Sequence, residues 1–142
     1  MESGHNTVWE HRRAELWDRI FQVTQDVVIL AETLQETPGT QTVREELTKS
    51  AMSVGKYLAR ATAAEREGAF RSNIEEARMA AIESDYWLRL AYIVQQREEV
   101  QRDLSSIITQ YVGIIELLHK MGQHVRDAHD VGAHTRGPKV NL

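Results

Sequence analysis

Residues 65–96 read EREGAFRSNIEEARMAAIESDYWLRLAYIVQQ, and this stretch decides the fold. Its apolar and small residues recur at steps of three and four, which places them along one side of an α-helix. At about 1.5 Å per residue, such a helix is roughly 48 Å long. Because its apolar side cannot remain in water, the sequence predicts that three other helices cover it. The predicted inward residues are Phe70, Ile74, Ala77, Ala81, Ser84, Leu88 and Ala91.

The first of the covering helices is predicted over residues 8–35, where apolar residues keep the same spacing for several turns. This segment is apolar over more than one face, which implies a second surface for a partner. The residues predicted to point inward are Leu16, Trp17, Ile20, Phe21, Thr24, Val27, Val28, Ala31 and Leu34.

A break follows at Pro38, because proline stops a helix from continuing and the adjacent glycine permits a turn. Thr40 or Thr42 is then predicted to open the second helix, since a side-chain oxygen can accept from an unpaired first-turn N–H. This helix is predicted to end in a turn at residues 61–64. Gly55 in its interior is expected to mark a bend or a close helix crossing.

The last helix is predicted from residue 100 and is expected to stop by Gly122. Four helices with short connections predict an all-α, up-down-up-down four-helix bundle. In this organisation residues 1–7 form an N-terminal extension, residues 8–123 form the bundle, and residues 124–142 form a flexible tail.

The composition limits the functions that the chain can have. Its 142 residues are the size of one domain. The lack of cysteine excludes thiolate catalysis, disulfides and cysteine-bound zinc. The net charge of −4 disfavours a generic polyanion binder. No signal-peptide-like run and no run of roughly 20 apolar residues is present, so a cytoplasmic protein without membrane contact is expected.

Several large apolar residues fall beside the predicted inward stripes rather than on them. A monomer rarely exposes that much contiguous apolar area, which favours self-association. The alternative is that these residues are scattered singly and need no partner. The predicted oligomer interface consists of Trp9, Val23, Ile29, Leu30, Trp87, Tyr92, Ile93 and Leu117.

Five basic residues form two stripes at helical spacing: Lys49, Lys56 and Arg60, and then Arg71 and Arg78. Repeated in an oligomer, such stripes can bind phosphates even when the total charge is negative, so they are the candidate contacts to nucleic acid or a partner. The alternative is a solvated face of mixed charge, because acidic residues lie among them.

Glu116 and His119 have the Glu-x-x-His spacing of di-iron bundles. Such a site also needs carboxylates from facing helices, and Glu83 is the acid expected near the middle of the bundle. We favour a surface pair, with Glu83 instead paired to an Arg or Lys across an interface because a buried unpaired carboxylate is costly. No metal site, cofactor or catalytic residue is therefore predicted. The alternative is a metal-dependent, ferritin-like bundle enzyme that uses these three residues.

Two segments resemble a known family. Residues 46–54, ELTKSAMSV, are similar to its second helix, and residues 70–91 are similar to its third helix. The family comprises the four-helix bundle proteins encoded in intervening sequences of bacterial 23S ribosomal RNA genes. Its relatives include the accessory variability proteins of diversity-generating retroelements. The residues in register with the third-helix pattern are Phe70, Ile74, Ala77, Glu83, Leu88 and Ala91.

The resemblance implies a homopentameric barrel of bundles with a central channel. Because the sequence shows no catalytic motif, we expect a non-enzymatic scaffold or adaptor. Another protein is the first expected partner, and the retroelement relatives point to a reverse transcriptase. RNA or DNA is the second expected partner.

Overall fold

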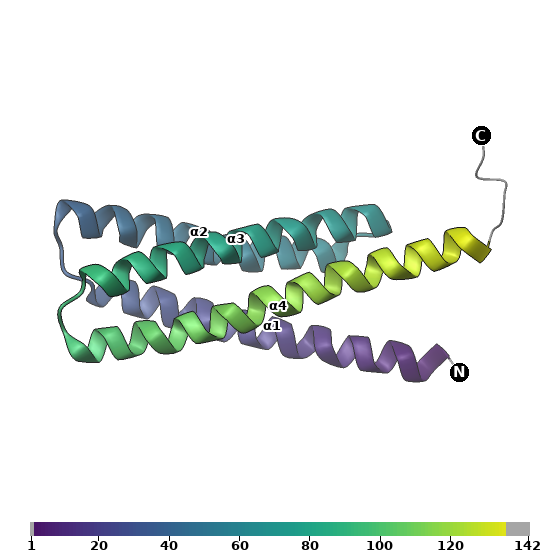
Figure 1. Ribbon diagram of the computed structural model, residues 1–142, viewed down its shortest axis with the longest axis horizontal. Helices are drawn as coiled ribbons and strands as arrows, with labels where there is room; N and C mark the ends of the chain where they lie inside the picture. Colours follow the sequence, from purple (N-terminus) through teal and green to yellow (C-terminus); the bar gives the residue numbers. More distant parts are fainter. Residues whose placement is uncertain (1, 136–142) are drawn as a thin grey trace.

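The computed structural model describes the backbone of residues 2–135 and the side chains of residue 11 and residues 13–123. This part of the chain forms four helices: α1 (Glu2–Thr33), α2 (Pro38–Ala63), α3 (Glu67–Val94) and α4 (Glu98–Thr135). Each helix packs on the next, and α4 packs on α1. The backbones of the diagonal pair α1 and α3 do not pack on each other within these residues, although Cζ of Arg13 lies 4.7 Å from the centre of the Phe70 ring. The start of α1, the α2–α3 turn and the end of α4 lie towards one end (Figure 1). The expected all-α, up-down-up-down bundle is confirmed.

The outer helix ends differ from the predicted ones. α1 already begins at Glu2, and α4 continues past Gly122 to Thr135. A glycine costs a helix only roughly 1 kcal/mol, and no proline precedes Pro138 in this part of the sequence. Gly122 alone is therefore too weak a signal to end α4. In the described part of the chain, no helix is both long enough and apolar enough to cross a membrane.

The start of α2 corrects the predicted cap. Thr37, and neither Thr40 nor Thr42, is the N-cap residue, and its hydroxyl accepts from the backbone N–H of Thr40 at 3.2 Å. Pro38 occupies the first helical position. Proline fits there because its missing N–H would have no partner inside the helix and its φ is already helical. The break and the start of α2 thus coincide.

The α3–α4 connection is tied to the end of α1. Arg97 donates from Nη2 to the carbonyl oxygen of Thr33 at 2.7 Å. The last carbonyls of a helix lack partners within the helix, so a guanidinium there satisfies one of them and complements the helix dipole. This hydrogen bond therefore ties the α3–α4 connection to the end of α1, next to the α1–α2 connection.

The side of α1 that is buried in the core is narrower than the side that the sequence predicted to point inward. Its buried residues follow steps of four and three along one stripe. Trp17 is 39% exposed and Phe21 is 68% exposed, so the prediction that both point inward was wrong. Conversely, Val23 and Leu30 are buried in the core, so their assignment to an oligomer interface was also wrong. The buried stripe consists of Leu16, Ile20, Val23, Val27, Leu30 and Leu34.

Small residues line the contact between α2 and α3, which pack on each other more extensively than α1 packs on its neighbours. Ala51 of α2 and Ala81 of α3 are fully buried, and the hydroxyls of Ser50 and Ser84 lie 3.0 Å apart. From α4, the fully buried ring of Tyr111 joins this core. The predicted inward residues of α3 are all buried, which confirms that interpretation.

Candidate interaction surfaces

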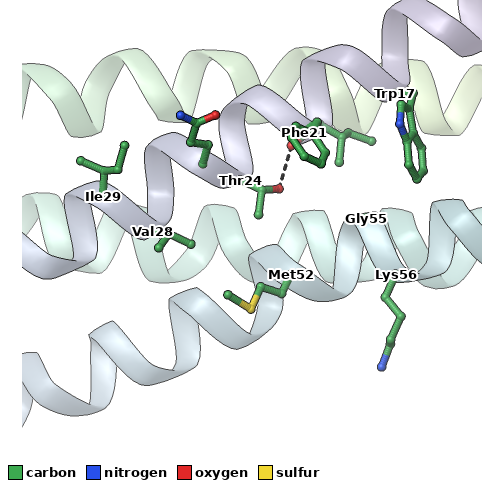
Figure 2. A pocket seen from close by; sticks show the side chains of 10 residues that line it. Trp17, Phe21, Thr24, Val28, Ile29, Met52, Gly55 and Lys56 are labelled. Carbon is green, nitrogen blue, oxygen red and sulfur yellow. Dashed lines mark hydrogen bonds between the residues drawn. The ribbon is translucent and has the colours of Figure 1, made fainter.

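A groove of about 480 Å³ lies between α1 and α2 and is lined almost entirely by apolar groups. Figure 2 shows Trp17, Phe21 and Val28 along α1, with Met52 on α2 opposite them and Lys56 pointing away from α1. We call this surface the α1–α2 groove. Its full lining is Trp17, Ile20, Phe21, Thr24, Gln25, Val28, Ile29, Met52, Gly55 and Lys56.

The α1–α2 groove exists because α1 carries two parallel stripes. Trp17, Phe21, Thr24 and Val28 repeat the spacing of the buried stripe but lie about one residue further along, which rotates them by about 100° around the helix. Thr24 does not offer a free hydroxyl, because it donates to the carbonyl oxygen of Ile20 at 2.7 Å. The floor of the groove is therefore effectively apolar.

Gly55 lines the groove without being required by a close helix crossing. A Cβ atom added at this position would meet Cγ2 of Ile20 at 3.9 Å, which is ordinary van der Waals contact. Glycine is therefore not needed here for a close helix crossing, and the bend that the sequence equally allowed stays a prediction.

We expect Gly55→Ala to raise the free energy of unfolding by about 0.5–1 kcal/mol, because alanine restricts the unfolded chain and favours the helix. Urea denaturation followed by circular dichroism measures the change. Gly113→Ala is the matched control and should gain less, because a Cβ there would lie 2.8 Å from Nη2 of Arg19 and displace it. A loss of stability in Gly55→Ala would show that the backbone requires glycine.

A second apolar surface runs along the outside of α3, opposite its buried side. Its residues follow one another at steps of three and four, and most of them are exposed, with Ile93 the most open at 75%. Leu90 in this series is half-buried against the core. We call the series the α3 outer stripe, and it consists of Met79, Ile82, Tyr86, Leu90 and Ile93.

The residues predicted to form the oligomer interface differ in how exposed they are. Ile29, Tyr92 and Ile93 are exposed, as an interface requires. Trp87 and Leu117 are half-buried against the core, so each has only part of its surface free for a partner. Trp9 lies in the helical backbone of α1, but its side chain is outside the described residues.

The predicted basic stripes are only partly free. Lys49, Lys56 and Arg60 are exposed on α2, and none of them pairs with a carboxylate in the described part of the chain. Arg78 instead donates to Glu75 at 2.8 Å on the same helix.

The remaining basic stripe residue, Arg71, helps to line a mixed polar groove of about 420 Å³ between α3 and α4. Glu75, Glu76 and His119 share this groove, so carboxylates accompany the cations there. The stripe on α2 is accordingly the more strongly cationic of the two.

The proposed metal ligands do not form a site. Glu83, Glu116 and His119 are all exposed, the first on α3 and the other two on α4. Among the described residues, no three His, Asp or Glu side chains come together to hold a metal ion. The expectation that Glu83 lies near the inward side of α3 was wrong, because the inward positions around it are Ser84 and Ala81.

Comparison with known proteins supports the fold. No protein-family model and no curated protein matches the chain. Among solved structures it is similar to a protein of unknown function from the S23 ribosomal protein family of Bacteroides thetaiotaomicron. The TM-score is 0.69 and the identity 20%, over 79% of this chain and 98% of that one. At this identity the similarity shows the fold alone, and a link to retroelement proteins stays a prediction.

Proposed function

We propose that this protein is a non-enzymatic scaffold that self-associates and binds a partner protein through its exposed apolar surfaces. The observation that carries this proposal is the α1–α2 groove, where Phe21 and Ile29 are 68% and 55% exposed beside the apolar floor. Contiguous apolar patches of this kind mark interaction sites because exposure to water is unfavourable. The α3 outer stripe adds a second such surface.

The finer parts of the proposal come from the family resemblance of residues 46–54 and 70–91. By that resemblance the assembly has five subunits that surround a channel, and the partner is a reverse transcriptase. The bundle is well suited to such a role, because its four helices form a rigid support and leave apolar side chains outside the core.

Phe21→Ser tests the proposal. We expect the substitution to weaken self-association by about 30-fold or more, as truncation of an aromatic interface anchor commonly does. Sedimentation equilibrium over a range of concentrations measures this change. Val112→Ser is the matched control, since Val112 is an exposed apolar residue on α4 outside both surfaces. A wild-type protein that stays monomeric at high concentration would contradict self-association.

A second candidate function is nucleic-acid binding, and the geometry around Tyr57 favours it. Nζ of Lys56 lies 4.8 Å from the centre of the Tyr57 ring, and Cζ of Arg60 lies 5.4 Å from it. Two unpaired cations held beside one ring on an exposed helix offer phosphates a fixed site. RNA or DNA is the ligand proposed for this site.

For this candidate we expect Lys56→Glu together with Arg60→Glu to reduce RNA binding and to flatten its dependence on salt, since two phosphate contacts are lost. Fluorescence anisotropy at several salt concentrations measures both effects. Arg89→Glu is the control, because Arg89 is exposed on α3 and already paired with Asp85 at 2.8 Å. Equal RNA binding by the wild type and the double variant would remove this function.

A further inference from the structure

The two exposed apolar surfaces of this bundle differ in shape and lie on different sides. The α1–α2 groove is a hollow between two helices, whereas the α3 outer stripe is a ridge on one helix. α1 and α3 occupy diagonal positions, and their backbones do not pack on each other in the described chain. Neither surface can therefore cover the other within one molecule.

The two surfaces match in length and in spacing. The groove residues of α1 extend from Trp17 to Ile29, and the stripe extends from Met79 to Ile93. At a rise of 1.5 Å per residue, these correspond to about 18 Å and about 21 Å. Side chains at steps of three and four form the ridges that pack between neighbouring helices. A helix is thus the natural occupant of the groove, and the chain itself carries one with the required ridge.

The charges beside the two surfaces are complementary. Lys56 lines the groove, and Lys49 lies seven residues earlier on the same face of α2, and both are exposed. Glu76 and Glu83 lie seven residues apart on α3, beside the outer stripe, and both are exposed. None of the four has an oppositely charged partner within the described chain. Equal spacing lets both lysines face both carboxylates across one contact, as in paired coiled-coil flanks.

We infer that the α3 outer stripe of a second copy of this chain lies in the α1–α2 groove, with its Glu76 and Glu83 facing Lys49 and Lys56. The inference rests on the proposed self-association and names the two surfaces that meet. Because they are unlike and lie on different sides, each copy uses one surface for the preceding copy and the other for the next. Such a head-to-tail contact produces a closed ring or an open chain, in contrast to a two-fold dimer.

Charge exchange tests this pairing with protein purified free of nucleic acid. The first variant carries Lys49→Glu and Lys56→Glu, and the second carries Glu76→Lys and Glu83→Lys. We expect each alone to self-associate about tenfold more weakly than the wild type at low salt, because like charges then oppose each other. One chain with all four changes should recover association, because opposite charges again meet at every contact. An equimolar mixture of the two variants should recover it in part, because contacts between different variants pair opposite charges but a ring of five subunits keeps at least one contact between identical variants.

The control is Glu98→Lys with Glu116→Lys, which makes the same change in net charge as the second variant, at exposed positions of α4 outside both surfaces. This variant should associate like the wild type. Analytical ultracentrifugation of all six samples, including the wild type, provides the comparison. Circular dichroism confirms that each variant remains helical.

The inference is overturned if the wild type self-associates and Phe21→Ser weakens it, yet neither the mixture nor the fourfold variant recovers association. In that case the groove binds something other than α3, and the proposed scaffold function remains. A monomeric wild type would overturn both proposals together. Recovery of association in both samples would support the pairing. Two variants that each associate weakly can associate with one another when the groove of one contacts the oppositely charged stripe of the other.

Discussion

Tyr111→Ala is expected to lower the free energy of unfolding by about 4 kcal/mol, as removal of a fully buried aromatic ring typically does. Tyr111 is among the largest fully buried side chains of the bundle and has no exposed surface. Its removal leaves a cavity between helices that are held in place along their whole length by other buried residues, so the space cannot close completely. Urea denaturation monitored by circular dichroism measures the loss.

Tyr111→Phe is the matched control, because it keeps the ring and removes only the hydroxyl. That hydroxyl is buried and makes no hydrogen bond of good geometry in the structure. Removing a buried polar group that lacks a partner is nearly neutral or stabilising, so we expect a change within about 1 kcal/mol of the wild type. If Tyr111→Phe were as unstable as Tyr111→Ala, the hydroxyl rather than the ring would hold this part of the core.

Alkaline pH is expected to produce the second large effect. Burial raises the pKa of the Tyr111 hydroxyl well above its ordinary value, and the nearby Ser84 hydroxyl offsets part of that increase. Above about pH 10 the unfolded chain loses this proton, while the folded chain keeps it. The unfolded state then binds fewer protons, so stability contributed by this group is full below pH 10 and falls by about 1.4 kcal/mol per pH unit above it.

The measurement compares urea denaturation of the wild type and Tyr111→Phe from pH 9 to pH 11.5. The difference between their free energies of unfolding isolates Tyr111, because the other titrating groups are common to both proteins. We expect the difference to shift steadily in favour of Tyr111→Phe above about pH 10. A difference that stays constant with pH would show that the hydroxyl ionises as readily in the folded protein as in the unfolded chain.

The fold was largely predictable because each helix carries a regular apolar stripe. In α3, only one side of the helix combines Phe70, Ile74 and Leu88 with small residues, and that side is the buried one. The interruption at Pro38 was equally clear, since proline is tolerated at the first position of a helix but not inside one. The helix ends without such residues, at the beginning of α1 and the end of α4, were predicted less well.

The candidate site was predictable only in part. Exposure of Ile29 and Ile93 followed correctly from their positions beside the stripes. Glu83, however, differs by a single position from the fully buried Ser84, and one residue rotates a side chain by about 100° around a helix. An error of one residue in predicting which side of the helix faces the core is therefore enough to predict that Glu83 is buried when it is in fact exposed.

The sequence by itself determined that this chain forms four amphipathic helices, where the first break falls, and that more apolar surface is present than one core needs. Only the tertiary structure decided which of the two parallel stripes of α1 enters the core. Leu16 and Ile20 face the other helices, and Trp17 and Phe21 remain outside. The physical reason is that helical spacing fixes which residues share a side, whereas the orientation of that side depends on how all four helices pack together.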